Sequence, residues 1–153
     1  MISGVIPARL SVVTLGAADL PSLRRFYLSM GWQERPDSDD GFASFLLGGV
    51  LLALYPADLL QAEAAPDLAP RPPGTWNGVT LALNVDSRHE VDRVFSEAVG
   101  AGARSVAEPQ DRDWGGRSGY ISDPEGNRWE VAWAPGLAFD GRGAVVGLIP
   151  TGA

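Results

Sequence analysis

One carboxylate in the second half of the chain stands out as a group that could do chemistry. The stretch Arg128–Trp133 reads Arg-Trp-Glu-Val-Ala-Trp, so that Trp129 and Val131 alternate with Glu130. Because successive side chains of a strand point to opposite faces, Glu130 lies on the face opposite these apolar residues. A carboxylate at that place could bind a metal, move a proton, pair with Arg128 or face water.

The residues just before Glu130 predict the turn that positions it. Asp123-Pro124-Glu125-Gly126 has proline to preset φ, an aspartate that can accept backbone N–H bonds, and glycine for positive φ. Short apolar runs flank this turn on both sides. The stretch from Gly119 to Trp133 therefore predicts a β-hairpin that carries Glu130 on its second strand.

Length and composition limit the classes of protein. The chain has 153 residues, a net charge of −7 and 45% hydrophobic residues, which is typical of one globular domain. Its acidity and the lack of a basic stripe argue against nucleic-acid binding. It has no cysteine, which excludes disulfides and thiolate chemistry. No apolar run predicts a membrane span and no signal peptide is recognisable, so we expect a cytoplasmic protein.

The first half of the chain predicts the order β-α-β-β-β. Asp19 is a candidate N-cap and Pro21 suits the first turn of a helix that ends at Gly31. Gly48-Gly49 is a good hairpin turn. The expected strands are residues 10–15, 32–36, 42–47 and 50–55.

The second half predicts the same order again. Residues 79–85 alternate as a strand, a helix follows from a cap at Asp86 or Ser87 to Gly100, and residues 103–107 form a strand before a polar loop and the hairpin. We therefore expect one domain made of two modules, with their helices on one side of a pseudo-symmetric sheet. The expected segments are module 1 at about 9–56, a proline-rich linker at 57–77, module 2 at about 78–135, and a tail at 136–153.

The hairpin also resembles a known family. Asp-Pro-Glu-Gly-Asn followed by Trp-Glu-Val resembles the end of the second repeat in the vicinal oxygen chelate superfamily, which includes glyoxalase I, extradiol dioxygenases and bleomycin-resistance proteins. The resemblance covers about residues 9–135. It implies an α+β fold in which two βαβββ modules form a curved mixed-sheet cup, with helices on the outer face and ligands inside. It also implies a homodimer.

The resemblance implies four metal-ligand positions, and most of them lack a donor here. Val12 and Thr80 stand where the family has histidines, Leu52 matches the acid of the first half, and Glu130 matches the last ligand. Valine and leucine have no lone pair, and one carboxylate with one hydroxyl is a poor site for nickel, zinc or iron. The only histidine, His89, falls in the second helix. We therefore expect neither a divalent metal nor another cofactor.

Strand periodicity predicts the side chains that line the cup. An apolar floor with a few polar groups is usual for a small-ligand pocket. Leu10, Leu54, Ala82 and Ala132 are expected on the same faces, and three aromatic residues are expected in loops near the rim: Trp76, Trp114 and Tyr120. The predicted ligand-binding residues are Val12, Thr14, Leu52, Thr80, Asn84, Trp114, Tyr120, Arg128 and Glu130.

These residues leave several functions open. The first hypothesis is a protein of the glyoxalase/bleomycin-resistance type that binds a small hydrophobic or cationic organic molecule without a metal. The second is a lyase, isomerase or dioxygenase-type enzyme in which Glu130 is the catalytic base or a metal ligand. The third is a dimer with an empty cup. Glu130 itself could anchor an amine, transfer a proton, or be a solvated carboxylate.

Overall fold

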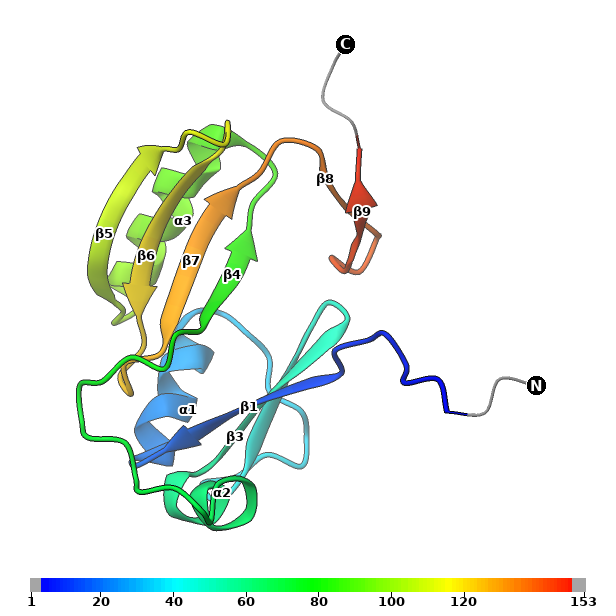
Figure 1. The fold of residues 1–153 in the computed structure, drawn as a ribbon. Coiled ribbons are helices and arrows are strands. Elements are labelled where there is room, and N and C mark those ends of the chain that lie inside the picture. The colour runs from blue at the N-terminus through cyan, green and yellow to red at the C-terminus, as the bar shows by residue number, and fades with distance from the viewer. Residues whose placement is uncertain (1–3, 150–153) are drawn as a thin grey trace.

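The computed structural model describes residues 4–149, and its first half forms a three-stranded sheet (Figure 1). Strand β1 is parallel to β3, which pairs with β2 in antiparallel fashion. Of the strand expected at residues 32–36, only a bridge between Glu34 and Phe45 forms. The elements are β1 (Val12–Ala17), α1 (Leu20–Ser29), β2 (Ala43–Leu47), β3 (Val50–Pro56) and α2 (Ala57–Ala64).

The second half forms a four-stranded sheet in the order β4-β7-β6-β5, and β4 is parallel to β7. The mixed α+β class expected from the sequence is confirmed. A short antiparallel pair of strands follows in the tail. The elements are β4 (Thr80–Asn84), α3 (Arg88–Gly100), β5 (Arg104–Asp111), β6 (Arg117–Ser122), β7 (Arg128–Trp133), β8 (Leu137–Phe139) and β9 (Val145–Leu148).

Local signals place the two long helices. Asp19 caps α1 by accepting the N–H of Ser22 at 3.1 Å, and Gly31 follows the helix with a φ of 86°. In α3, residues at helical spacing point inward, so that Val91, Phe95 and Ala98 are buried. These faces cover one side of each sheet, and α3 lies behind β5, β6 and β7 in Figure 1.

Strand periodicity decides which side chains enter the core. In β7, Trp129 and Val131 are buried against the helix side, whereas Glu130 points to the other face. The core is continuous between the two halves, because Tyr27 and Phe45 of the first half belong to the same buried cluster as Trp129. The indoles of Trp32 and Trp129 meet edge to face, with ring centroids 5.4 Å apart.

A buried polar contact joins the halves at the centre of this core. The Tyr27 hydroxyl donates to Oδ2 of Asp123 at 2.6 Å, and the indole N–H of Trp129 donates to the Tyr27 oxygen at 2.9 Å. Burial raises the pKa of the Asp123 carboxyl, and burial beside this carboxylate raises the pKa of Tyr27. Since each polar group has a partner, the contact fixes how α1 meets the second hairpin.

The Asp-Pro-Glu-Gly turn uses its carboxylates for the same junction. Oδ1 of Asp123 accepts the backbone N–H groups of Glu125 and Asn127, and Gly126 has the positive φ expected of it, 87°. The Glu125 carboxylate reaches across to the first half, where it accepts the N–H of Ala18 at 2.6 Å. The turn is therefore a structural link between the modules.

Helix α2 covers part of the first sheet on the side away from α1. It continues directly from β3, and a β-carbon built on Gly16 would lie 3.2 Å from the Cα of Ala57 and 3.3 Å from Leu60. The absence of a side chain at Gly16 lets this helix approach β1. Among residues 4–149, no helix is both long and apolar enough to cross a membrane.

Candidate functional site

The face of the second sheet that is opposite to α3 carries the polar side chains expected of the cup. The strand pairing arranges them in rows, because side chains of paired residues point to the same side. One row contains Thr80, Arg128 and Ser122, the next Ala82, Glu130 and Tyr120, and the last Asn84, Ala132 and Ser118. We call this surface the concave face.

Glu130 lies in the middle row of the concave face, between Ala82 and Tyr120. It is half-buried, yet among residues 4–149 its carboxylate has neither an ion pair nor a hydrogen bond. The pairing with Arg128 considered from the sequence does not form. The guanidinium of Arg128 donates instead to the carbonyl of Gly126 at 3.4 Å. Glu130 is thus available to a ligand.

Arg112 is a third charged group of this face, after Glu130 and Arg128, and sequence reasoning missed it. Its Nε donates to Oγ of Ser118 at 2.9 Å and its Nη2 to the Ser118 carbonyl oxygen at 3.0 Å. The guanidinium lies over the Tyr120 ring, 5.6 Å from the centroid. The sequence placed Arg112 in a polar loop, and only the pairing of β5 with β6 shows that it folds back onto the sheet.

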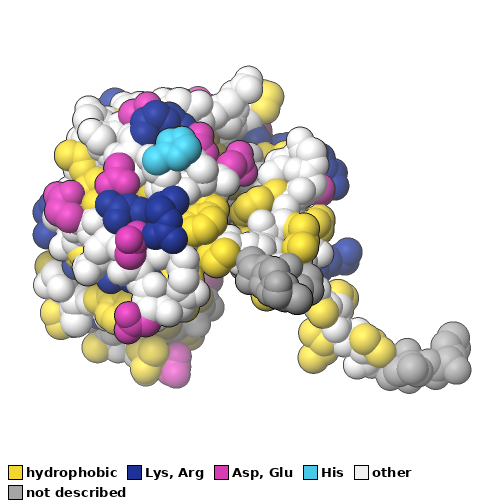
Figure 2. All heavy atoms as spheres, turned by 90° about the horizontal axis from the view of Figure 1, so that it is seen from above, with side chains coloured by type: hydrophobic (Ala, Val, Ile, Leu, Met, Phe, Trp, Pro, Cys, Tyr) yellow, Lys and Arg dark blue, Asp and Glu magenta, His cyan; other side chains and the backbone are white. Residues whose placement is uncertain are grey.

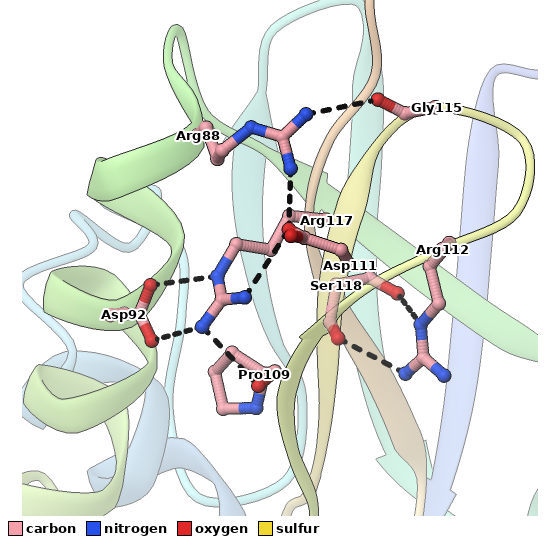
Figure 3. A network of polar contacts seen from close by, with 8 residues as sticks. All are labelled: Arg88, Asp92, Pro109, Asp111, Arg112, Gly115, Arg117 and Ser118. Carbon is pink, nitrogen blue, oxygen red and sulfur yellow. Dashed lines mark hydrogen bonds and ion pairs between the residues drawn. The ribbon is translucent and has the colours of Figure 1, made fainter.

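Figure 3 shows that Arg112 and Arg117 lie on opposite sides of the second sheet. Arg117 faces α3, where it donates to both carboxylate oxygens of Asp92 at 2.7 and 2.8 Å. Asp111 lies between Arg117 and Arg88 and accepts from both. The arginines on the helix side are therefore neutralised by aspartates, whereas Arg112 is bound by a serine and an aromatic ring.

Trp114 lies at the end of the concave face, next to Gly116. A β-carbon built on Gly116 would come within 1.9 Å of the Trp114 indole, so the glycine makes room for the ring. The Trp114 residue is 53% exposed. Tyr120, expected with Trp114 and Trp76 in the rim loops, lies instead within β6, in the middle row of the concave face. Trp76, the other rim aromatic considered, is in the exposed linker, where its indole N–H donates to the carbonyl of Val79.

A cleft with a volume of about 780 Å³ adjoins the concave face along β4. Thr80, Ala82 and Asn84 belong to both surfaces. The turn between β8 and β9 closes one end of the cleft, since a β-carbon on Gly48 would lie 2.9 Å from the Gly143 carbonyl oxygen. The other lining residues are mainly apolar and include Val13, Trp32, Leu52, Leu83, Trp129 and Phe139.

The residues predicted from the first half lie in three different places. Val12 and Thr14 are exposed on the side of β1 away from α1, and Leu10 lines the cleft. The prediction that Leu52 and Leu54 face the cup was wrong, because both are buried in the core with 2% and 0% exposure. Leu52 still borders the cleft from the core side. The run Val50–Tyr55 is apolar throughout, so its periodicity did not reveal which residues face inward.

The four positions at which the family holds a metal do not fit one here. Val12, Leu52 and Thr80 supply no strong donor, and Glu130 is the single carboxylate. Over the described residues, no three His, Cys, Asp or Glu side chains are close enough to share an ion. His89 lies in α3 and lines a separate surface hollow with Arg88, Asp92, Asp111 and Arg117. Figure 2 shows acidic and basic side chains intermixed around the histidine.

Solved structures share this architecture. A glyoxalase-related enzyme from Fulvimarina pelagi is 28% identical, with a TM-score of 0.81 over 93% of this chain and 99% of that chain. A glyoxalase/bleomycin resistance protein/dioxygenase from Nocardioides is also 28% identical, with a TM-score of 0.69 over 86% and 87% of the two chains. A lactoylglutathione lyase from Agrobacterium tumefaciens is 23% identical, with a TM-score of 0.63 over 84% and 95%, which shows a common fold.

Sequence relatives give a shorter match. An uncharacterized protein of Mycobacterium bovis is 40% identical over 53 residues, which are 35% of this chain. The matched segment spans about a third of that relative's length. The sequence profile of the Glyoxalase/Bleomycin resistance protein/Dioxygenase superfamily matches residues 9–131, which are most of the chain. The chain therefore belongs to the Glyoxalase/Bleomycin resistance protein/Dioxygenase superfamily.

Proposed function

We propose that this protein binds a small organic molecule on the concave face and in the adjoining cleft, without a divalent metal. The observation that carries the proposal is Glu130, a half-buried carboxylate without a side-chain partner in the described chain, paired with Ala82 of the strand that lines a largely apolar cleft of about 780 Å³. Pockets for small ligands have about 300–1,000 Å³ and combine apolar walls with a few polar groups. In this proposal the cleft takes the apolar body of the ligand and Glu130 anchors a cationic group.

The donor set supports binding without a metal. Lewis-acid chemistry of the family type needs several ligands that hold an ion in an open site. Only Glu130 offers a charged oxygen at the four matching positions. The expected absence of a divalent cofactor therefore remains part of this proposal.

The experiment is a ligand screen by thermal shift, with aromatic amines, neutral aromatics and thiol conjugates in buffer containing EDTA. We expect some compounds to raise the Tm of the protein, and an amine hit to lose most of its shift in Glu130→Ala. Leu83→Trp, which would place a larger side chain in the cleft, should weaken the binding of neutral aromatic compounds as well. If no compound stabilises the protein, or if binding appears only after nickel, zinc or iron is added, the proposal is wrong.

An enzymatic function is the second candidate, and the position of Glu130 beside the Tyr120 side chain favours it. A positioned carboxylate can act as a general base on a substrate proton. The structural neighbour named as a lactoylglutathione lyase suggests a compound to test, lactoylglutathione. Turnover that is lost in Glu130→Gln while binding persists would establish this candidate in place of simple binding.

We also propose a cytoplasmic homodimer. Large apolar side chains are exposed on the N-terminal segment, which extends away from the rest of the molecule, and on β9 (Figures 1 and 2). Exposed apolar surface can mark an interface, and each of these two segments offers several such side chains. These residues are Val5, Ile6, Leu10, Val145, Val146, Leu148 and Ile149. Light scattering should give twice the chain mass, and Ile6→Asp with Leu148→Asp should give the monomer.

A further inference from the structure

Besides Arg128, whose guanidinium donates to the Gly126 carbonyl, the concave face holds two opposite charges that form no ion pair with each other. Arg112 lies over the ring of Tyr120, and Glu130 is the residue paired with Tyr120 on the neighbouring strand. Both charged side chains are half-buried. Within the described chain, neither has an ion pair, whereas the arginines on the helix side are bound to carboxylates. Both charges are partly withdrawn from water and lack a charged partner in the described chain, so both are available to an external ligand.

The contacts of Arg112 explain why it stays apart from Glu130. Ser118 is 1% exposed and accepts hydrogen bonds from the guanidinium through its hydroxyl and its carbonyl oxygen. The guanidinium also packs over the Tyr120 ring. Arg112 also follows β5 directly, in a loop closed by the bond from its own N–H to the Gly116 carbonyl at 2.9 Å. Its position is therefore set by the sheet and does not need a carboxylate.

Within residues 4–149, the hydrogen bonds of Arg112 leave one edge of its guanidinium without a partner. A guanidinium has five N–H bonds, of which Ser118 takes one on Nε and one on Nη2. The free N–H bonds of Nη1 and Nη2 lie side by side along the remaining edge. Two parallel donors of this kind match the two oxygens of a carboxylate.

From this arrangement we infer that the ligand is a zwitterion with an apolar or aromatic body. Its carboxylate binds the free edge of Arg112, its protonated amine binds Glu130, and its body lies between them, with any apolar extension reaching across β4 into the cleft. The inference rests on the proposed function, because it names the class of molecule that the same surface binds. Arg112 thereby becomes a specificity-determining residue that selects an acid group.

The test uses three probes of the same shape: 4-(aminomethyl)benzoate, 4-methylbenzylamine and 4-methylbenzoate. Isothermal titration in EDTA measures each Kd for the unaltered chain. We expect the zwitterion to bind at least about tenfold more tightly than either singly charged probe, because a hydrogen-bonded charge contributes about 1.5 kcal/mol or more.

Variants assign each charge to its residue. In Arg112→Gln, 4-(aminomethyl)benzoate should bind only as tightly as 4-methylbenzylamine binds the unaltered chain. In Glu130→Gln, it should bind only as tightly as 4-methylbenzoate does. Arg93→Gln is the matched control, since it removes one arginine from α3 on the other side of the sheet and should leave all three affinities unchanged. Ser118→Ala keeps both charges, and it should weaken the binding of 4-methylbenzoate less than Arg112→Gln does.

The outcomes separate this inference from the proposed function. If 4-methylbenzylamine binds as tightly as 4-(aminomethyl)benzoate, or if Arg112→Gln changes no Kd, the inference of a zwitterionic ligand is refuted. The proposal that the protein binds an organic molecule would still stand. If none of the probes binds and the wider screen also finds no ligand, both proposals fail. Circular dichroism of each variant confirms that a lost affinity is not lost folding.

Discussion

Removing the hydroxyl of Tyr27 tests whether the buried polar contact holds the two halves together. The change is Tyr27→Phe, which keeps the ring that packs against Phe26, Trp32, Phe45 and Trp129. It removes the donor to Asp123 at 2.6 Å and the acceptor for the Trp129 N–H at 2.9 Å. Because Tyr27 is fully buried, water cannot replace either bond.

The expected loss follows from these two bonds. A hydrogen bond to a charged group contributes about 1.5–3 kcal/mol, and a buried donor left without a partner costs about 1–3 kcal/mol. Since some relaxation occurs, we expect the free energy of unfolding to fall by about 3 kcal/mol. For a chain of this length, that corresponds to a Tm lower by about 6–12 °C.

Urea unfolding at pH 7, followed by tryptophan fluorescence, measures the loss. Tyr55→Phe is the matched control, because the Tyr55 hydroxyl donates to Glu63 at the surface, and its removal should cost well under about 1 kcal/mol. If Tyr27→Phe is as stable as Tyr55→Phe, the polar contact does not contribute to joining the halves, and the reasoning is refuted.

Three further changes test other parts of the structure. Glu125→Ala removes the acceptor of the Ala18 N–H at 2.6 Å and should cost about 1 kcal/mol in the same urea titration, whereas no loss would mean that the turn does not link the modules. Gly116→Ala puts a β-carbon within 1.9 Å of Trp114 and 2.4 Å of the Trp133 carbonyl oxygen, so Trp114 should move and its fluorescence maximum shift; Gly141→Ala, with open space around it, should change nothing. The backbone N–H groups of Ala144 and Arg142 hold the pKa of Asp140 below its ordinary value. The ionised carboxylate therefore stabilises the β8–β9 turn fully at pH values above the ordinary pKa, and this stabilisation is lost as the pH falls through the lowered pKa of the folded protein. Amide exchange at Ala144 should show this loss, and Asp140→Asn should abolish the pH dependence.

The sequence predicted most of the fold because its signals were local. The Asp19 cap, the inward residues of α3 and the alternation of Trp129 with Glu130 each depend on neighbours in the chain. The uniform run Val50–Tyr55 gave no such alternation, and there the assignment of Leu52 and Leu54 failed. Strand β5 extends to Asp111, further than expected, because its last residues pair with β6.

The candidate site was less predictable because it depends on contacts between distant residues. Glu130 could be placed on the concave face from periodicity alone, and so could Thr80 and Asn84. Arg112 could not, since its role depends on Ser118 and Tyr120 after the hairpin has formed. The cleft also depends on how the tail meets the Gly48 turn, which no local pattern encodes.

The helix that lies against Gly16 makes the two halves of the repeat unequal. A duplicated unit would begin with two equivalent surfaces for ligands. Here one end of the first surface is covered by a segment of the chain itself, because Ala57 and Leu60 lie against Gly16. We therefore expect a stoichiometry of one ligand per chain, with the charged groups that hold it on the second half.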